Sequence, residues 1–271
     1  MAERAPAHVR FTPFRAELVP GYGVNNPLYL YKALLPFRDN NKWIVRINRW
    51  DDPDFKVEPV PSSIEKYKIA RFEFAQLQQV GVVVPKFHTV AVGPFNLSTI
   101  ESENFLFYTI EEKVDGENLF EVRFEEGEVD VVARQIDHCF ARVAQYLWDV
   151  TMEGGNYLYN LTFGGGLRYN LEYAEDGGLS QYMWGTRPGR KEKEVILTDI
   201  DPTLEYYDLD ETNHNFYQMV VPGLVSMIVG MERRLGSSRL VKAREVALRF
   251  LDSIPTTNAY YEEMVALKAK L

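Results

Sequence analysis

Cysteine, long apolar runs and excess positive charge are all scarce in this chain of 271 residues. Its one cysteine, Cys139, has no second thiol to pair with, which excludes an internal disulfide and favours a reducing, cytoplasmic setting. We expect no membrane span and, over residues 1–19, no signal peptide, because the necessary apolar stretches are missing. The net charge of −9 argues against nucleic acid as a partner, and an acidic surface suits a cationic substrate.

Apolar residues make up 46% of the chain, and up to about Gly127 their pattern favours strands. One helix is predicted in this part, with a capping box at Ser62 and Glu65 and an end near Gly81. We expect a five-stranded antiparallel sheet with this helix over roughly residues 18–112. The strands include residues 29–31, 42–49, 82–85 and 105–110.

From about Glu128 onward the apolar residues recur at helical spacing. The first helix is long, and its apolar face holds Val132, Ile136, Cys139, Phe140, Val143, Leu147 and Val150. Three helical patterns follow Tyr217, the clearest with Leu240, Ala243, Ala247, Phe250, Leu251 and Ile254. A β-rich part followed by a helical part predicts an α+β fold of two lobes, residues 1–115 and 116–271.

Two carboxylates, Asp199 and Asp201, follow an apolar run that starts at Val195. Such a run predicts a buried strand, and residues two apart in an extended chain point to the same side. Their oxygens suit a hard cation such as Mg²⁺. The alternative interpretation is a strand that ends in a polar turn at Asp201-Pro202.

The same segment, Asp199-Ile-Asp201-Pro-Thr203, matches the Asp-x-Asp-x-Thr motif of haloacid-dehalogenase phosphatases. That resemblance implies Asp199 as a nucleophile and Asp201 as the acid/base. In that family the motif opens the fold and a parallel sheet follows it, whereas helical patterns follow it here. The phosphatase is therefore the weaker alternative.

Four motifs follow one another upstream: Gly21-x-Gly23-x-Asn25, Ile44-Val-Arg46-Ile, Arg71-x-Glu73 before Gly81-Val-Val-Val-Pro, and a segment from Phe107 to Leu119. In this order they resemble the N-lobe of kinase-like phosphotransferases, closest to the aminoglycoside and choline phosphotransferase group. The resemblance implies a bilobal protein-kinase-like fold, with a small antiparallel β N-lobe and a larger helical C-lobe.

The resemblance also implies an ATP site. A Gly-rich loop lets backbone N–H groups approach phosphates, and a cation fixed by a carboxylate neutralises the phosphate charge; here we expect Arg46 to pair with Glu73. The implied nucleotide-binding residues are Gly21, Gly23, Asn25, Arg46, Glu73, Glu111 and Val114. Glu111 and Val114 lie in the segment from Phe107 to Leu119, which resembles the hinge strand of that family, and the hinge backbone would meet the purine. Asp199 would bind Mg²⁺, with Asp201 as a further candidate ligand.

The family's catalytic loop, His-x-Asp with Asn five residues after the Asp, is absent from this sequence. In one alignment, Asp176 is the base and Gln181 the metal ligand, just before a strand at residues 182–184; Asp176-Gly-Gly is equally a good hairpin turn. In the other, Asn156 is the ligand and Thr151 stands where the Asp should be, so no base remains.

Two functions follow from these alignments. The first is an ATP-dependent phosphotransferase that acts on a small molecule or a peptide side chain. The second is a catalytically degenerate kinase-like protein, a pseudokinase, that binds a ligand or a protein partner. The loop before Trp184 discriminates between them, because the enzyme needs a carboxylate there and the binding protein does not.

Overall fold

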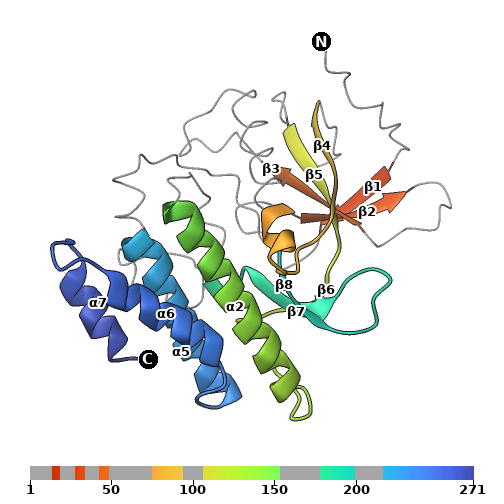
Figure 1. Ribbon diagram of the computed structural model, residues 1–271. Coiled ribbons are helices and arrows are strands. Elements are labelled where there is room, and N and C mark those ends of the chain that lie inside the picture. The colour runs from red at the N-terminus through yellow and green to blue at the C-terminus, as the bar shows by residue number, and fades with distance from the viewer. Residues whose placement is uncertain are drawn as a thin grey trace. The chain divides into compact units, whose positions relative to one another are not determined.

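The computed structural model describes residues 14–18, 28–33, 43–48, 75–93, 106–152, 178–198 and 216–271. These residues form helices and antiparallel sheets, as in an α+β fold (Figure 1). The chain divides into two compact units, one made of Met1–Ile64 and Lys86–Lys113, the other of Glu65–Pro85 and Val114–Leu271. The sequence-based division into lobes at residue 115 stays a prediction.

The first unit holds a five-stranded antiparallel sheet in the order β1-β2-β3-β5-β4 (Figure 1). A five-stranded antiparallel sheet is what the sequence predicts, but it begins at Phe14 rather than near Leu18. The missed strand alternates apolar and charged residues, which is a period-two signal. The strands are β1 (Phe14–Leu18), β2 (Leu28–Ala33), β3 (Trp43–Asn48), β4 (Phe87–Gly93) and β5 (Leu106–Glu112).

The strand predicted at residues 82–85 is wrong, because these residues follow the end of a helix and form neither helix nor strand. Residues 75–79 are helical, and Gly81 follows with a φ of 90° that favours glycine. The Gly81 amide donates to the Gln78 carbonyl at 3.0 Å, and the Val82 amide donates to the Leu77 carbonyl at 2.9 Å. This is a Schellman motif, in which Val82 and Leu77 are both buried.

The second unit holds a three-stranded antiparallel sheet of β6 (Asp115–Asn118), β7 (Tyr182–Thr186) and β8 (Glu194–Leu197) in that order. Gly116 of β6 lies opposite Gly185 of β7. A Cβ on Gly116 would come within 2.3 Å of the Trp184 carbonyl oxygen, and one on Gly185 within 2.6 Å of the Asp115 carbonyl oxygen. The two strands approach this closely because neither residue has a side chain.

Besides the helical residues 75–79, the described part of the second unit holds four longer helices (Figure 1). The long helix begins directly after Glu128, as predicted, and every described residue of its predicted apolar face is buried. None of the described helices combines the length and hydropathy needed to cross a membrane. The helices are α2 (Val129–Met152), α5 (Val221–Leu235), α6 (Val241–Ser253) and α7 (Tyr261–Lys268), with one π-helical turn, η2 (Phe216–Val220), before α5.

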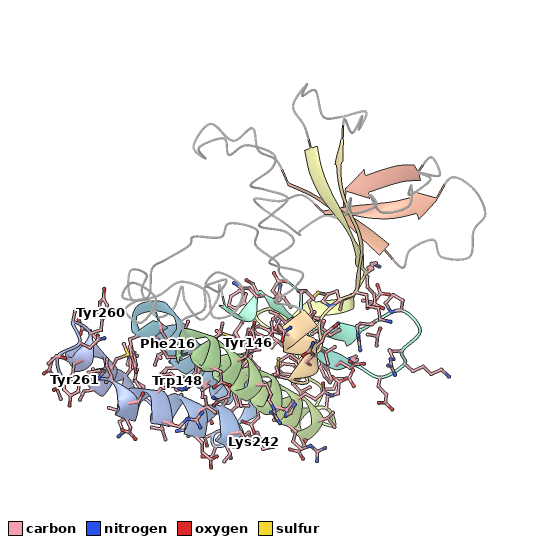
Figure 2. All side chains as sticks on the ribbon, turned by 45° about the horizontal axis from the view of Figure 1, so that its top comes forward. Tyr146, Trp148, Phe216, Lys242, Tyr260 and Tyr261 are labelled. Carbon is pink, nitrogen blue, oxygen red and sulfur yellow. The ribbon has the colours of Figure 1, made fainter. Side chains whose placement is uncertain are left out.

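An aromatic cluster joins α2, η2 and α6. Trp148 stacks on Phe250 with ring centroids 4.9 Å apart, and Phe216 meets both rings edge-on at 5.3 and 5.2 Å. Figure 2 labels Trp148 and Phe216 of this cluster. Such pairs add to the stabilisation that burial of the rings provides. Cys139 is buried in the core of the same unit, and burial raises the pKa of its thiol to about 12, so it is a core residue as predicted.

Candidate functional site: the end of the β7–β8 hairpin

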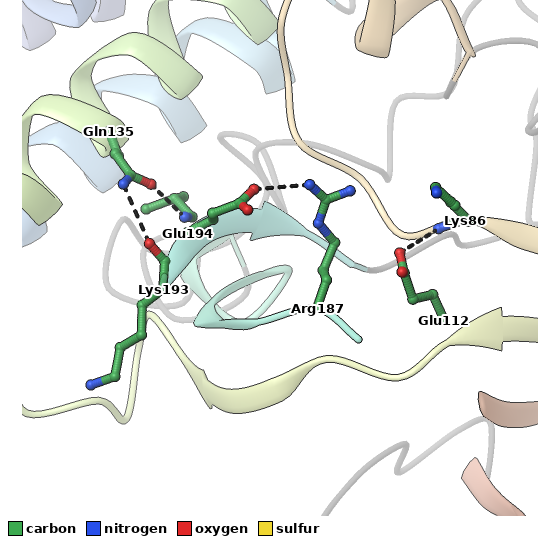
Figure 3. Close-up of polar contacts among 7 residues, drawn as sticks. Lys86, Glu112, Gln135, Arg187, Lys193 and Glu194 are labelled. Atoms are coloured by element: carbon green, nitrogen blue, oxygen red, sulfur yellow. Dashed lines mark hydrogen bonds and ion pairs between the residues drawn. The ribbon is translucent and has the colours of Figure 1, made fainter. Parts of the chain in front are cut away.

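The turn between β7 and β8 is fixed by its sequence, Arg187-Pro188-Gly189-Arg190. The Arg190 amide donates to the Arg187 carbonyl at 2.9 Å, and Gly189 has a φ of 79°. Proline at the second position and a glycine of positive φ at the third are the signature of a type II turn. The Arg187 guanidinium also bonds Glu194 across the hairpin at 3.0 Å (Figure 3).

At the opposite, open end of this hairpin, the segment that leads into β7 meets the segment that follows β8. The sequence predicts metal ligands in both segments. The Thr198 amide donates to the Gln181 carbonyl at 2.9 Å, and the Thr198 hydroxyl donates to the same oxygen at 3.2 Å. Tyr182 lies opposite Leu197, and both side chains are buried. Because Thr198 directly precedes Asp199 in the sequence, Gln181 lies beside the start of the predicted metal-binding segment.

Gln181 itself is buried, with 8% of its surface exposed, and its backbone amide donates to the Gly178 carbonyl at 3.2 Å. Residues 178–181 thus form a helical turn that leads into β7. The strand that the first catalytic-loop alignment requires after Gln181 is present. Asp176 and Asn156 lie outside the described part of the chain, and Thr151 of the second alignment lies in the last turn of α2.

The remaining predicted site residues are described only in part. Arg46 lies on β3 opposite Thr109, and Glu111 lies on the neighbouring β5, but their side chains are outside the description. Val114 is half-buried in the link between β5 and β6. The predicted Arg46–Glu73 ion pair therefore stays a prediction. Residues wholly outside the described ranges are Gly21, Gly23, Asn25, Glu73, Asp199 and Asp201.

The carboxylate of Glu112, at the end of β5, accepts a hydrogen bond from the backbone. Glu112 is buried, and its Oε2 accepts a hydrogen bond from the Lys86 amide at 3.3 Å (Figure 3). The Glu112 amide donates in turn to the Lys86 carbonyl at 2.8 Å. Glu112 therefore holds β4 and β5 together at their ends, whereas Asp115 on β6 is exposed.

A second ion pair holds the start of β8 against the start of α2. Lys193 Nζ lies 2.7 Å from Glu128 Oε1. This hydrogen bond lowers the pKa of Glu128 and raises the pKa of Lys193, so both groups are charged at neutral pH.

Metal ligation, by contrast, is not evident within the described ranges. No three histidine, cysteine, aspartate or glutamate side chains there are placed to hold one metal ion. His138, on α2, is half-buried, and burial lowers its pKa, so it is neutral at physiological pH. Thr198 is the last described residue of this segment. The predicted metal ligand Asp199 is the next residue in the sequence, and Asp201 follows two positions later.

No protein-family model matches the chain, and no curated protein matches it. Among solved structures, it is similar to a microcompartment-associated aminopropanol kinase, with 14% identity over 94% of this chain and 90% of that chain and a TM-score of 0.39. It is also similar to WaaP in complex with acyl carrier protein, with 10% identity over 95% of this chain and 87% of that chain and a TM-score of 0.42. Identities and TM-scores this low do not establish a family.

Proposed function

We propose that the chain is an ATP-dependent phosphotransferase of kinase-like fold that acts on a small molecule or a peptide side chain. The observation that carries the proposal is the contact at the open end of the β7–β8 hairpin, where Thr198 donates twice to the Gln181 carbonyl. This contact brings the residue five positions after Asp176 beside the residue that precedes Asp199. A base, an amide ligand and a metal-binding carboxylate in this order are the parts that phosphoryl transfer needs.

The nucleotide would be bound by the residues that the sequence resemblance indicates. Backbone amides of the Gly-rich loop would approach the phosphates, and a cation held by a carboxylate would neutralise them. The hinge backbone would meet the base of the nucleotide. The proposed residues are Gly21, Gly23 and Asn25 for the loop, Arg46 with Glu73 for the ion pair, and Glu111 and Val114 for the hinge.

The donor set suits Mg²⁺, because it consists of carboxylate and amide oxygens. Asp199 and Gln181 would hold the ion, with Asp201 as a further ligand and Asn156 as the alternative to Gln181. When bound, Mg²⁺ would neutralise charge on the phosphates of the nucleotide. Asp176 would take the proton of the acceptor hydroxyl. The acceptor oxygen would then bond to the γ-phosphorus while the bond between the γ-phosphorus and the ADP oxygen breaks. The acidic chain suits an acceptor that carries positive charge.

One observation favours the catalytically degenerate alternative, a kinase-like binding protein: no His-x-Asp occurs anywhere in the sequence. The phosphatase alternative receives no such support. It requires the strand before Asp199 to open a parallel sheet, and β8 pairs antiparallel with β7 in a three-stranded sheet.

The test is production of ADP from Mg-ATP with a panel of cationic hydroxyl compounds as acceptors. Wild-type protein should produce ADP, and Asp176→Asn should lose this activity while it still binds ATP. Asp252→Asn is the matched control, because Asp252 is an exposed carboxylate of α6 that pairs with Lys268. Activity that survives in Asp176→Asn contradicts the assigned base. Absence of ADP production in a wild-type protein that binds Mg-ATP favours the degenerate alternative.

A further inference from the structure

The outer edge of β8 is closed by two different partners. β8 is the end strand of its sheet and, among the described strands, pairs only with β7. The Thr198 amide faces β7, so by alternation the Val195 and Leu197 amides face away from it. The Leu197 amide donates to the Val83 carbonyl at 3.0 Å, and the Val195 amide donates to Oε1 of Gln135 at 2.9 Å. A backbone carbonyl and a side chain from α2 thus take the place of a second neighbour strand.

Gln135 contacts the start of β8 through both ends of its amide group (Figure 3). Besides accepting from Val195, it donates from Nε2 to the Lys193 carbonyl at 3.5 Å. It lies next to the fully buried Ile136, at the border of the apolar face of α2. Packing of α2 through Ile136 therefore fixes the backbone position from which the Gln135 side chain reaches the Val195 amide.

We propose that Gln135 is a positioning residue that holds β8 in the register from which the chain continues through Thr198 to Asp199. The proposal rests on the proposed function. β8 has only four residues and lies at the end of its described sheet, so few hydrogen bonds fix its register. A slip by one residue would offer Gln135 a position whose amide faces β7. A slip by two would move the chain by about 6.6 Å along the strand.

Three variants separate this role from a general contribution to folding. Gln135→Leu removes both hydrogen bonds and substitutes an apolar side chain of similar size. Gln135→Glu keeps an oxygen that can accept from the Val195 amide. Gln145→Leu is the matched control, since Gln145 lies on the same helix and bonds Asp149 at 2.6 Å and also Arg249, both of them helical residues.

The first readout is calorimetric binding of ATP with and without Mg²⁺. We expect the factor by which Mg²⁺ tightens ATP binding to fall about tenfold in Gln135→Leu, the low end of the loss seen when outer partners of a metal ligand are removed. This factor should stay near the wild-type value in Gln135→Glu and Gln145→Leu. Affinity for ATP without Mg²⁺ should be equal in all four proteins. The proposal is overturned if Mg²⁺ tightens ATP binding to Gln135→Leu by the same factor as in the wild type. It is also overturned if this factor falls equally in Gln145→Leu.

The second readout, amide hydrogen exchange over residues 194–198, does not depend on nucleotide. Faster exchange there in Gln135→Leu than in Gln145→Leu supports the hold on β8, even where wild-type protein binds no ATP and the proposed function fails. Unchanged exchange in Gln135→Leu overturns the hold on β8, and leaves the proposed function to be judged by ATP binding alone.

Discussion

Thr198 bonds twice to the carbonyl oxygen of Gln181, through its amide at 2.9 Å and through its hydroxyl at 3.2 Å. Gln181 directly precedes β7, and Thr198 directly follows β8. The pair therefore closes the open end of the hairpin, and Asp199 is the next residue along the chain. This relationship connects the two segments to which the sequence resemblance gives metal ligands.

Thr198→Val tests the hydroxyl contribution to this closure. Valine keeps the branched shape and leaves the hydrogen bond from the backbone amide to the Gln181 carbonyl in place. Of the two hydrogen bonds to that carbonyl, only the one from the hydroxyl is lost. The free energy of unfolding should fall by about 1 kcal/mol, measured by urea denaturation. Thr186→Val, at the other end of β7, is the control and should change stability less. Equal effects of the two substitutions would show that the Thr198 hydroxyl adds nothing to the hairpin.

Gly116→Ala tests the close approach of β6 and β7. The new Cβ would meet the Trp184 carbonyl oxygen at 2.3 Å, a contact with backbone that only strand separation can relieve. We expect a loss of about 1–3 kcal/mol or more in the free energy of unfolding, as in overpacked cores. Gly127→Ala is the matched control, because nothing lies within 4 Å of its Cβ position. A near-neutral Gly116→Ala would contradict the close pairing of Gly116 with Gly185.

Asp137→Asn tests the pH dependence of stability. Asp137 of α2 is buried, and its Oδ1 accepts from the Ala243 amide at 2.8 Å at the start of α6. Burial raises its pKa above the ordinary value of 3.8, against the lowering effects of the α6 amides and of Lys242; Glu245 adds to the rise. The folded state therefore binds this proton more tightly than the unfolded state does. The contribution of Asp137 to wild-type stability should therefore fall as pH rises from 3.8 through the raised pKa.

Asparagine at this position cannot titrate and can still accept from the Ala243 amide. The difference in unfolding free energy between wild type and Asp137→Asn should therefore carry the pH dependence, with a slope of at most about 1.4 kcal/mol per pH unit. Urea denaturation from about pH 3 to about pH 7 measures it, in steps of about one unit. A difference that rises with pH over this range would mean that the carboxylate, not the acid, is favoured in the folded state.

Periodicity accounts for most of what the sequence predicts of the fold. The apolar residues of α2 from Val132 to Leu147 repeat at helical spacing, so the sequence alone predicts this buried face. The dipeptide Pro188-Gly189 is a local signal that predicts a turn. The run Val82–Val84 misleads because Val82 and Val84 are buried where the chain leaves a helix, and burial there selects the same apolar residues as a strand does. Local spacing cannot tell these two environments apart.

The site is less accessible to such reasoning, because its parts meet through tertiary contacts. The order of Gln181, β7, β8 and Thr198 follows from the motif alignment, and the structure adds the hydrogen bonds that join them. Gln135 has no such signal in the sequence. A lone glutamine beside an apolar helical face carries no chemical pattern, and its bond to the Val195 amide joins residues 60 positions apart. Its place next to the predicted face is the one feature that spacing reveals.

Calorimetric titration of Mg-ATP into wild-type protein and Asp199→Asn tests the central claim most directly. Asparagine keeps the shape and removes the charge, so folding should survive while affinity for Mg-ATP falls markedly and affinity for ATP alone does not. Asp252→Asn is the control, since Asp252 is an exposed carboxylate of α6 that pairs with Lys268. The account predicts Mg-ATP binding by wild type and by Asp252→Asn, and a selective loss in Asp199→Asn. No binding of Mg-ATP by the wild-type protein would contradict it.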